Sequence, residues 1–216
     1  MENQFYKSSG ISLISGAILI IATMVLHPTG GSIQHIIQIS NIIIVSHALG
    51  IFSLPFLSFG FYGLSQSILD NGRFSILAFI IMFLGLIAAM FAALINGLTL
   101  PYFLGLYTDN IESNEYILKP IIKYGFSVNK PLDYIFISAC CLAMFINSII
   151  IITQSKMPKW IGYYGLLLIT FTLIGVISNF VFTSVIGFRI FIFSIASWFL
   201  AIGYLLTKSK NEQRKN

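Results

Sequence analysis

The chain has 216 residues, of which 57% are hydrophobic and only 9% are charged, and its mean hydropathy is +0.91. Soluble domains carry about a quarter charged residues, so this composition excludes an ordinary soluble protein and predicts one that is dissolved in lipid. The formal charge of +5 comes without a basic stripe interleaved with aromatic residues, which argues against a nucleic-acid-binding face. At roughly 20 residues a crossing, the length allows about six or seven membrane spans.

Six apolar segments, taken in chain order, are each long enough to cross a bilayer. They cover residues 10–26, 41–64, 74–98, 132–153, 160–182 and 186–206. Backbone groups in hydrocarbon must be hydrogen-bonded within the segment, so each segment is predicted to be a helix. The sequence therefore predicts an all-α polytopic membrane helix bundle. Residues 1–207 form a single six-helix transmembrane domain in this prediction, and residues 208–216 form a basic cytoplasmic tail.

Two stretches between the spans are harder to assign. The third span can continue to Pro101, and only the apolar residues 183–187 separate the fifth span from the sixth. Residues 106–131 contain several charges together with apolar residues at helical spacing around Pro120. We expect this segment to be an interfacial loop with a short amphipathic piece that rests on lipid headgroups, or else a lid or partner surface.

Lys and Arg are unequally divided between the two sides that six alternating spans define. The richer side has Lys7, Arg73, Lys156, Lys159, Lys208, Lys210, Arg214 and Lys215, and the poorer side has Lys119, Lys123, Lys130 and Arg189. Cytoplasmic loops of membrane proteins carry the excess of basic residues. The sequence therefore predicts that both termini lie in the cytoplasm.

Small residues recur along two of the predicted helices and predict close helix packing. The third span has such a stripe at every fourth position, and the second span has a comparable one. These helix-packing candidates are Gly85, Ala89, Ala93 and Gly97 on the third span, and Ser46, Gly50, Ser53 and Gly60 on the second. We expect the two helices to touch or to share a neighbour.

Polar and ionisable groups near the spans collect toward the outer ends of the helices. The ligand-binding candidates are His27, His47, Asn96, Asp133 and Arg189, with Asn179 near the outer end of the fifth span. Ionised groups in membranes are costly and usually face a bundle interior, a wet cavity or the interface. Two interpretations stay open: snorkelling and amide bridges between helices, with Asp133 and Arg189 able to pair, or an outward-facing polar cavity that binds a small ligand.

Three histidines, His27, His35 and His47, raise the alternative of a metal or haem site, because imidazole is a common ligand for zinc and copper. Their spacing matches no metal-binding motif, so no metal ligand and no cofactor is assigned. The adjacent Cys140 and Cys141 are interpreted as packing residues. The chain has no Gly-x-Ser-x-Gly and no Walker motif, and no catalytic residue is assigned.

The segment His27-Pro28-Thr29-Gly30-Gly31, followed by Ser46-His47-Ala48-Leu49 and by Pro55 and Gly60, resembles a group of uncharacterised bacterial integral membrane proteins. The resemblance covers roughly the first two spans. It implies a multi-pass protein of the bacterial inner membrane, and it carries over no activity and no site residue.

The leading functional hypothesis is a non-enzymatic membrane protein that binds a small ligand, or takes part in transport, through an outward-facing polar site. A metal- or haem-binding redox component that uses the histidines is the alternative, and a membrane interaction subunit without a site is another. The expected partners are the lipid bilayer, a small-molecule ligand, and either another membrane protein or a second copy of the chain, but not nucleic acid.

Overall fold

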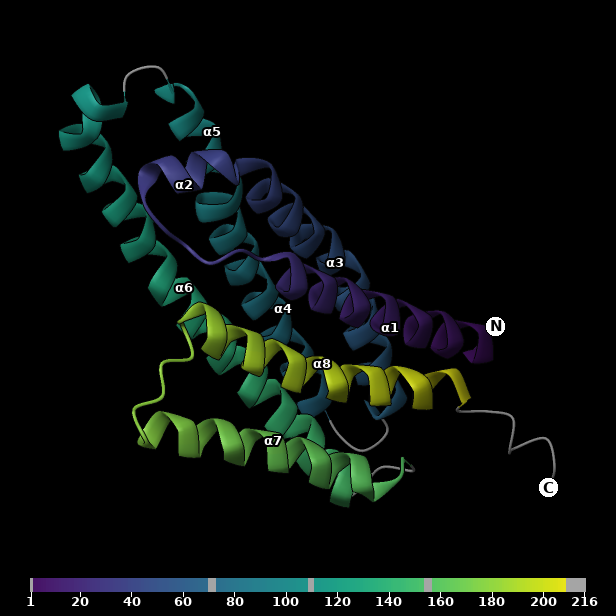
Figure 1. Cartoon of the computed structure of the whole chain (residues 1–216). Coiled ribbons are helices and arrows are strands. Elements are labelled where there is room, and N and C mark those ends of the chain that lie inside the picture. Colours follow the sequence, from purple (N-terminus) through teal and green to yellow (C-terminus); the bar gives the residue numbers. More distant parts are fainter. Residues whose placement is uncertain (1, 70–72, 109–110, 154–156, 209–216) are drawn as a thin grey trace, which may run out of the picture.

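The computed structural model describes residues 2–69, 73–108, 111–153 and 157–208, and every regular element in these ranges is a helix (Figure 1). The elements are α1 (Glu2–Leu26), α2 (Ile33–Gln38), α3 (Ser40–Ser67), α4 (Phe74–Ala92), the π-helix η2 (Ala93–Thr99), α5 (Leu100–Gly105), α6 (Ile111–Thr153), α7 (Lys159–Ile177) and α8 (Val185–Lys208). Helices α4, η2 and α5 follow one another without a break, and with them the described residues contain six helices long and apolar enough to cross a membrane. The predicted six-helix membrane bundle is confirmed.

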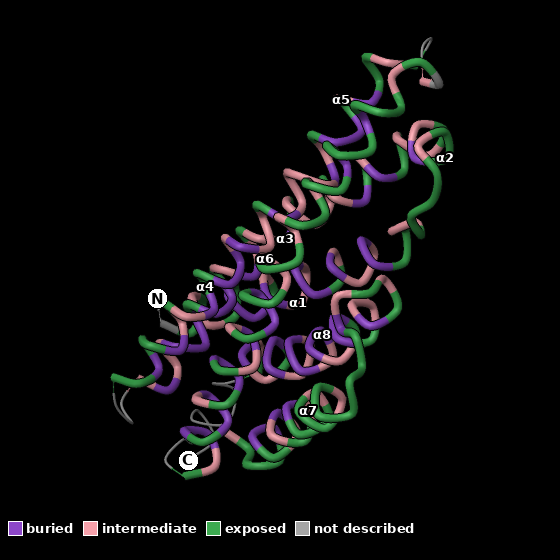
Figure 2. Tube along the Cα trace, turned by 90° about the vertical axis from the view of Figure 1, so that its left-hand side faces the viewer, coloured by how far each residue is buried: buried purple, intermediate pink, exposed green. Residues whose placement is uncertain are grey.

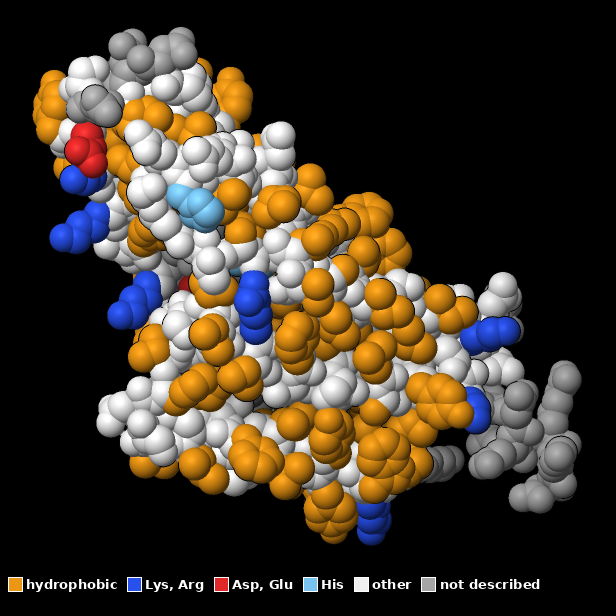
Figure 3. Space-filling view, in the orientation of Figure 1, with side chains coloured by type: hydrophobic (Ala, Val, Ile, Leu, Met, Phe, Trp, Pro, Cys, Tyr) orange, Lys and Arg blue, Asp and Glu red, His pale blue; other side chains and the backbone are white. Residues whose placement is uncertain are grey.

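The core of the bundle lies between helices that are distant in sequence. Helix α1 packs against α3 and α8, α4 packs against α6, and α6 packs against α7. Phe61 of α3 and Phe199 of α8 are both buried and meet edge to face, with ring centroids 4.9 Å apart. Burial is concentrated on the inward helix faces (Figure 2), whereas large apolar side chains such as Ile18, Phe52 and Leu84 are exposed. Such an apolar exterior fits a lipid solvent, and Figure 3 shows hydrophobic side chains spread across the viewed face, with few charged ones among them.

The small-residue stripes of the second and third spans do not pack mainly against each other. Each lies mainly against a different helix. On α3, Cβ atoms added at Gly50 and Gly60 would meet Thr23 and Leu13 of α1, whereas on α4 a Cβ at Gly85 would meet Ala139 of α6. Helix α3 and the third span do touch, and Gly97 is the residue of the stripe that lies against α3. The stripes therefore permit close approach of α1 to α3 and of α4 to α6.

The expected interfacial loop over residues 106–131 is wrong for most of its length, because residues 111–131 are the first half of α6. Pro120 and Pro131 lie inside this helix, where each removes one backbone donor. The remaining turns are held by local contacts, including an ion pair of 3.0 Å between Lys119 and Glu115. The buried side chains of Leu118 and Ile122 add an apolar cluster with α2 and α5.

Helix α6 is too long to lie within a bilayer. Its 43 residues correspond to about 65 Å at 1.5 Å per residue, against a hydrocarbon thickness of about 30 Å. Figure 1 shows its first half, with α2 and α5, extending past the end of α1 and the start of α8. The start of α1 and the end of α8 lie at the opposite end of the bundle. The level at which α1 ends is therefore a natural membrane boundary.

The fifth span is shorter than predicted, since α7 ends at Ile177 and not at residue 182. Asn179 has a positive φ of 59°, which Asn tolerates better than most residues. The amide of Phe180 donates to the Gly175 carbonyl at 2.8 Å, and the amide of Asn179 donates to the Val176 carbonyl at 3.1 Å. This is a Schellman cap, so the polar Asn179 ends α7. It does not line the cavity described below.

Some sequence predictions concern residues outside the described ranges. Most of the basic tail is among them, and Lys208 is its one described residue. The counted basic residues Lys156, Lys210, Arg214 and Lys215 lie outside the described residues as well.

Candidate ligand-binding cavity

The end of α1 positions His27. The His27 amide donates to the Thr23 carbonyl at 2.9 Å, which makes it the last residue bonded into the helix before the chain turns through Pro28. The His27 Nδ1 atom lies 2.9 Å from the Pro28 carbonyl oxygen. A carbonyl only accepts, so Nδ1 carries the proton and Nε2 keeps a lone pair. Burial, with a smaller contribution from the nearby Arg189, lowers the pKa of His27 and favours this neutral form.

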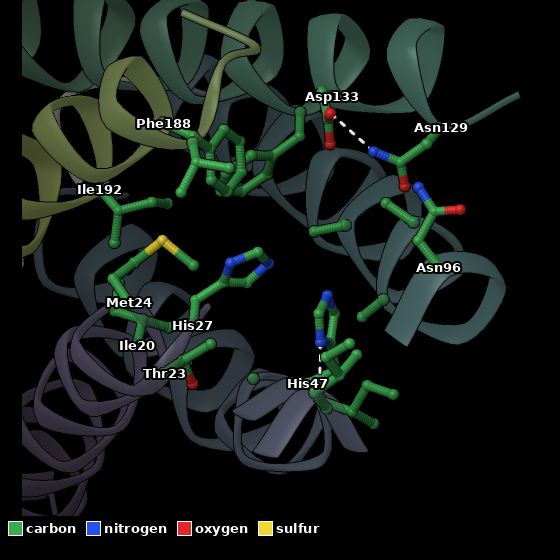
Figure 4. A pocket seen from close by; sticks show the side chains of 18 of the residues that line it. Ile20, Thr23, Met24, His27, His47, Asn96, Asn129, Asp133, Phe188 and Ile192 are labelled. Carbon is green, nitrogen blue, oxygen red and sulfur yellow. Dashed lines mark hydrogen bonds between the residues drawn. The ribbon is translucent and has the colours of Figure 1, made fainter. Parts of the chain in front are cut away.

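His47 lies about two turns into α3 and faces His27. Its Nδ1 atom is 2.8 Å from the Ile43 carbonyl oxygen, so here too Nδ1 is the donor and Nε2 keeps a lone pair. Ser46 donates to the same carbonyl at 2.9 Å and is fully buried. The two imidazole rings have centroids 4.8 Å apart and planes tilted by 54°. Figure 4 shows both rings projecting into one gap.

The π-helix η2 makes room for His47. A Cβ at Gly97 would overlap Cβ, Cγ and Cδ2 of His47, so only glycine allows this approach. Pro101, four residues further on, has no N–H for the Gly97 carbonyl, and this loss weakens the regular α-helical pattern here. π-helical turns inside α-helices occur frequently at functional sites. The π-helix thus carries the predicted Asn96 and the glycine that accommodates His47.

Helix α6 supplies the acidic side of the site. Asn129 and Asp133 are four residues apart, and therefore on one helix face, and the Asn129 amide donates to Asp133 Oδ2 at 2.7 Å. Asn96 and Asn129 point toward one another in Figure 4. The Oδ1 atom of Asn96 is buried without a hydrogen-bond partner in the described part of the chain, and a Cβ at Gly125 would lie 3.3 Å from it.

The sequence allows Arg189 to pair with Asp133, but in the structure Arg189 has other partners. Its Nε donates to the Met24 carbonyl at 3.1 Å, and its Nη2 donates to the His27 carbonyl. These carbonyls lie at the end of α1, where the last carbonyl groups of a helix have no backbone N–H donor within the helix. Among the described residues, no ion pair joins Arg189 to Asp133. Arg189 therefore ties α8 to α1 and aims its donors at the backbone.

His27, His47, Asn96 and Asp133 all line one cavity of about 410 Å³, whereas Arg189 lies beside it. The volume is within the range of small-molecule sites, about 300–1,000 Å³. Four phenylalanines and many aliphatic side chains form most of the remaining wall, and the stripe residues Gly50, Ser53, Ala89 and Ala93 also line it. The phenylalanines are Phe126, Phe136, Phe188 and Phe199.

Sequence reasoning missed Asn129 and the phenylalanine wall. Asn129 lies in a segment that was expected to be a loop. Had the segment been assigned as a helix, the spacing of four between Asn129 and Asp133 would have placed both on one helix face. Phe136, Phe188 and Phe199 lie in apolar spans, where the sequence does not distinguish a cavity wall from a lipid contact. Phe126, like Asn129, lies in the segment expected to be a loop.

The three histidines do not form one cluster. His35 is exposed on the short helix α2, which Ser32 caps by accepting from the His35 amide at 3.2 Å, and it does not line the cavity. Within the described residues, no three His, Cys, Asp or Glu side chains are placed to hold a metal ion. Cys140 is fully buried, with its Sγ 3.8 Å from Met82 Sδ, as a packing residue would be.

Comparison of the chain with protein-family models, with curated proteins and with solved structures found no match. The function of the protein is therefore inferred from the geometry of the cavity.

Proposed function

We propose that this protein binds a small molecule in the cavity between α1, α3, η2, α6 and α8. The observation that supports the proposal best is the convergence of His27, His47 and Asp133, from three helices, on one otherwise apolar cavity. Polar side chains in membrane proteins are costly and rarely placed without a partner or a function. Here Asp133 has only the neutral Asn129 as its hydrogen-bond partner among the described residues.

We further propose that the chain is a multi-pass protein of the bacterial inner membrane, with both termini in the cytoplasm. The excess of Lys and Arg supports this orientation. Lys7, Arg73, Lys159 and Lys208 of the richer side are exposed in the structure. The cavity would then face outward, because His27 is at the far end of α1 from the terminus. A C-terminal fusion to green fluorescent protein should fluoresce, while an alkaline phosphatase fusion there should be inactive; the reverse pattern would contradict the orientation.

Thiol labelling tests whether the cavity is open to water from that side. Ala93 lines the cavity, whereas Leu84, nine residues earlier in α4, is 56% exposed on the apolar exterior and does not line it. In a chain whose Cys140 and Cys141 are replaced by alanine, a charged thiosulfonate reagent should modify Ala93→Cys and leave the Leu84→Cys control unmodified. Thiosulfonates react with thiolates, which form in water and not in hydrocarbon.

Equal and slow modification of both cysteines would contradict a water-accessible cavity. Modification of Ala93→Cys only from the cytoplasmic side would preserve the cavity but contradict the outward orientation. A ligand that occupies the site should slow the modification of Ala93→Cys, which makes the same variant a binding assay.

A further inference from the structure

Three of the polar groups that reach the cavity, His27, His47 and Asp133, present hydrogen-bond acceptors to it. His27 and His47 each use their Nδ1 proton on a backbone carbonyl, which leaves two Nε2 lone pairs. Asp133 accepts from Asn129 through Oδ2, and its other oxygen has no partner in the described part of the chain. The donors of Arg189 are directed to carbonyls of α1. A ligand that binds to these three groups must therefore bring N–H or O–H donors.

The charge of the site favours a cation. No protein cation pairs with Asp133 among the described residues. A buried carboxyl without a counter-charge tends to keep its proton, and a cation beside Asp133 would supply the charge that stabilises the carboxylate. The walls add to this preference, because the faces of aromatic rings attract ammonium groups. Phe126, Phe136, Phe188 and Phe199 line the same cavity.

A metal ion fits these observations less well than an organic cation. The described residues provide no group of three ionisable ligands, and a bare ion would leave an apolar cavity of about 410 Å³ unfilled. A quaternary ammonium would satisfy the carboxylate and the rings but offers no N–H group to the two imidazoles. A primary ammonium can interact with the carboxylate, with the aromatic rings and with the two imidazoles.

We propose that the ligand is a protonated primary amine carried on an apolar, aromatic-sized body. This inference rests on the proposed function and specifies its ligand class. The ammonium group would lie between the Asp133 carboxylate and the imidazoles of His27 and His47, next to the phenylalanine wall, and the four phenylalanines would surround the apolar body.

Three related probes separate the contributions of charge and N–H donors. Phenethylamine is protonated at neutral pH and has both, trimethyl-phenethylammonium has the charge alone, and phenethyl alcohol has a donor alone. Binding to the purified protein in zwitterionic lipid nanodiscs is measured by calorimetry and by protection of Ala93→Cys. Phenethylamine should bind at least about tenfold more tightly than either analogue, because it alone combines the positive charge with N–H donors and charge-assisted hydrogen bonds are the stronger ones.

Asp133→Asn is the matched variant, because it removes the charge and keeps the size of the side chain. It should weaken phenethylamine at least about tenfold and leave phenethyl alcohol within about threefold. His47→Phe, which keeps an aromatic ring but removes the lone pair, should reduce the preference for phenethylamine over the trimethyl analogue.

Equal affinity for phenethylamine and phenethyl alcohol, or no effect of Asp133→Asn, would overturn the inference about ligand class. So would a failure of all three probes to bind while the thiosulfonate still modifies Ala93→Cys. An unreactive Ala93→Cys would instead overturn the proposed function, so the two failures are distinguishable.

Discussion

Replacing Gly97 with alanine should displace His47 and destabilise the bundle. The added Cβ would overlap Cβ, Cγ and Cδ2 of His47. His47 Cβ is bonded directly to the backbone of α3, so a change of rotamer cannot move it away. Either α3 and η2 separate or the imidazole leaves its position, and both changes disturb the cavity.

The magnitude follows from the packing. Inserting a methyl group into a well-packed interior costs typically about 1–3 kcal/mol. Alanine also gains up to about 1 kcal/mol over glycine in helix propensity. Gly105, at the end of α5, is the control because a Cβ there would meet nothing within 4 Å. Both variants gain helix propensity, so this gain cancels when they are compared. Gly97→Ala should therefore be less stable than Gly105→Ala by about 1–3 kcal/mol.

The assay is equilibrium unfolding in mixed micelles of dodecyl maltoside and dodecyl sulfate, followed by circular dichroism. A second measurement is phenethylamine affinity, which Gly97→Ala should lower and Gly105→Ala should leave unchanged. Adding His47→Ala should reduce the cost of Gly97→Ala without abolishing it, because Cγ and Cδ2 are removed while Cβ remains. If Gly97→Ala matched Gly105→Ala in stability and binding, the role assigned to Gly97 would be refuted.

Three other measurements test separate parts of the structure. Arg189→Met should lower stability by about 1–3 kcal/mol, because it leaves two carbonyls of α1 without their donors; an unchanged unfolding midpoint would show that water replaces the guanidinium. Asn179→Val should cost about 1–2 kcal/mol at its positive φ, whereas Asn179→Gly should be neutral, and equal stability of the two would argue against the Schellman cap. Burial lowers the pKa of His27 below its ordinary value of 6.5, so below that pH the unfolded chain binds more protons than the folded one. The free energy of unfolding should therefore fall as the pH drops below 6.5, less steeply in His27→Gln, and identical slopes would contradict a buried neutral His27.

Hydropathy was sufficient to predict the six spans, because lipid selects long apolar helices irrespective of their neighbours. Hydropathy failed for residues 111–131, because charged residues such as Glu115 and Lys119 led to the prediction of a loop. Outside the membrane a helix is stabilised by pairs four residues apart and by packing, which a window average cannot detect. The end of α7 was missed for a related reason, since its signal is the conformation of Asn179 and not its polarity.

The candidate site was predicted in part. Polarity and span order placed His27, His47, Asn96 and Asp133 on one side of the membrane, and the structure brings all four to one cavity. The hydrogen-bond partner of each group could not be predicted. Helix periodicity shows which residues share one face of a helix, but not which other helix packs against that face. Arg189 illustrates this limit: it shares the level of Asp133 but bonds to the exposed carbonyls that end α1.

A crystal structure with para-bromophenethylamine bound would show whether the cavity holds a cationic amine, because the anomalous signal of bromine locates the ligand without interpretation of weak density. We expect a bromine peak among Phe126, Phe136, Phe188 and Phe199, with the amine within hydrogen-bond distance of Asp133, and no peak there in Asp133→Asn. A cavity filled by a lipid chain, or a bromine peak elsewhere on the protein, would contradict this expectation.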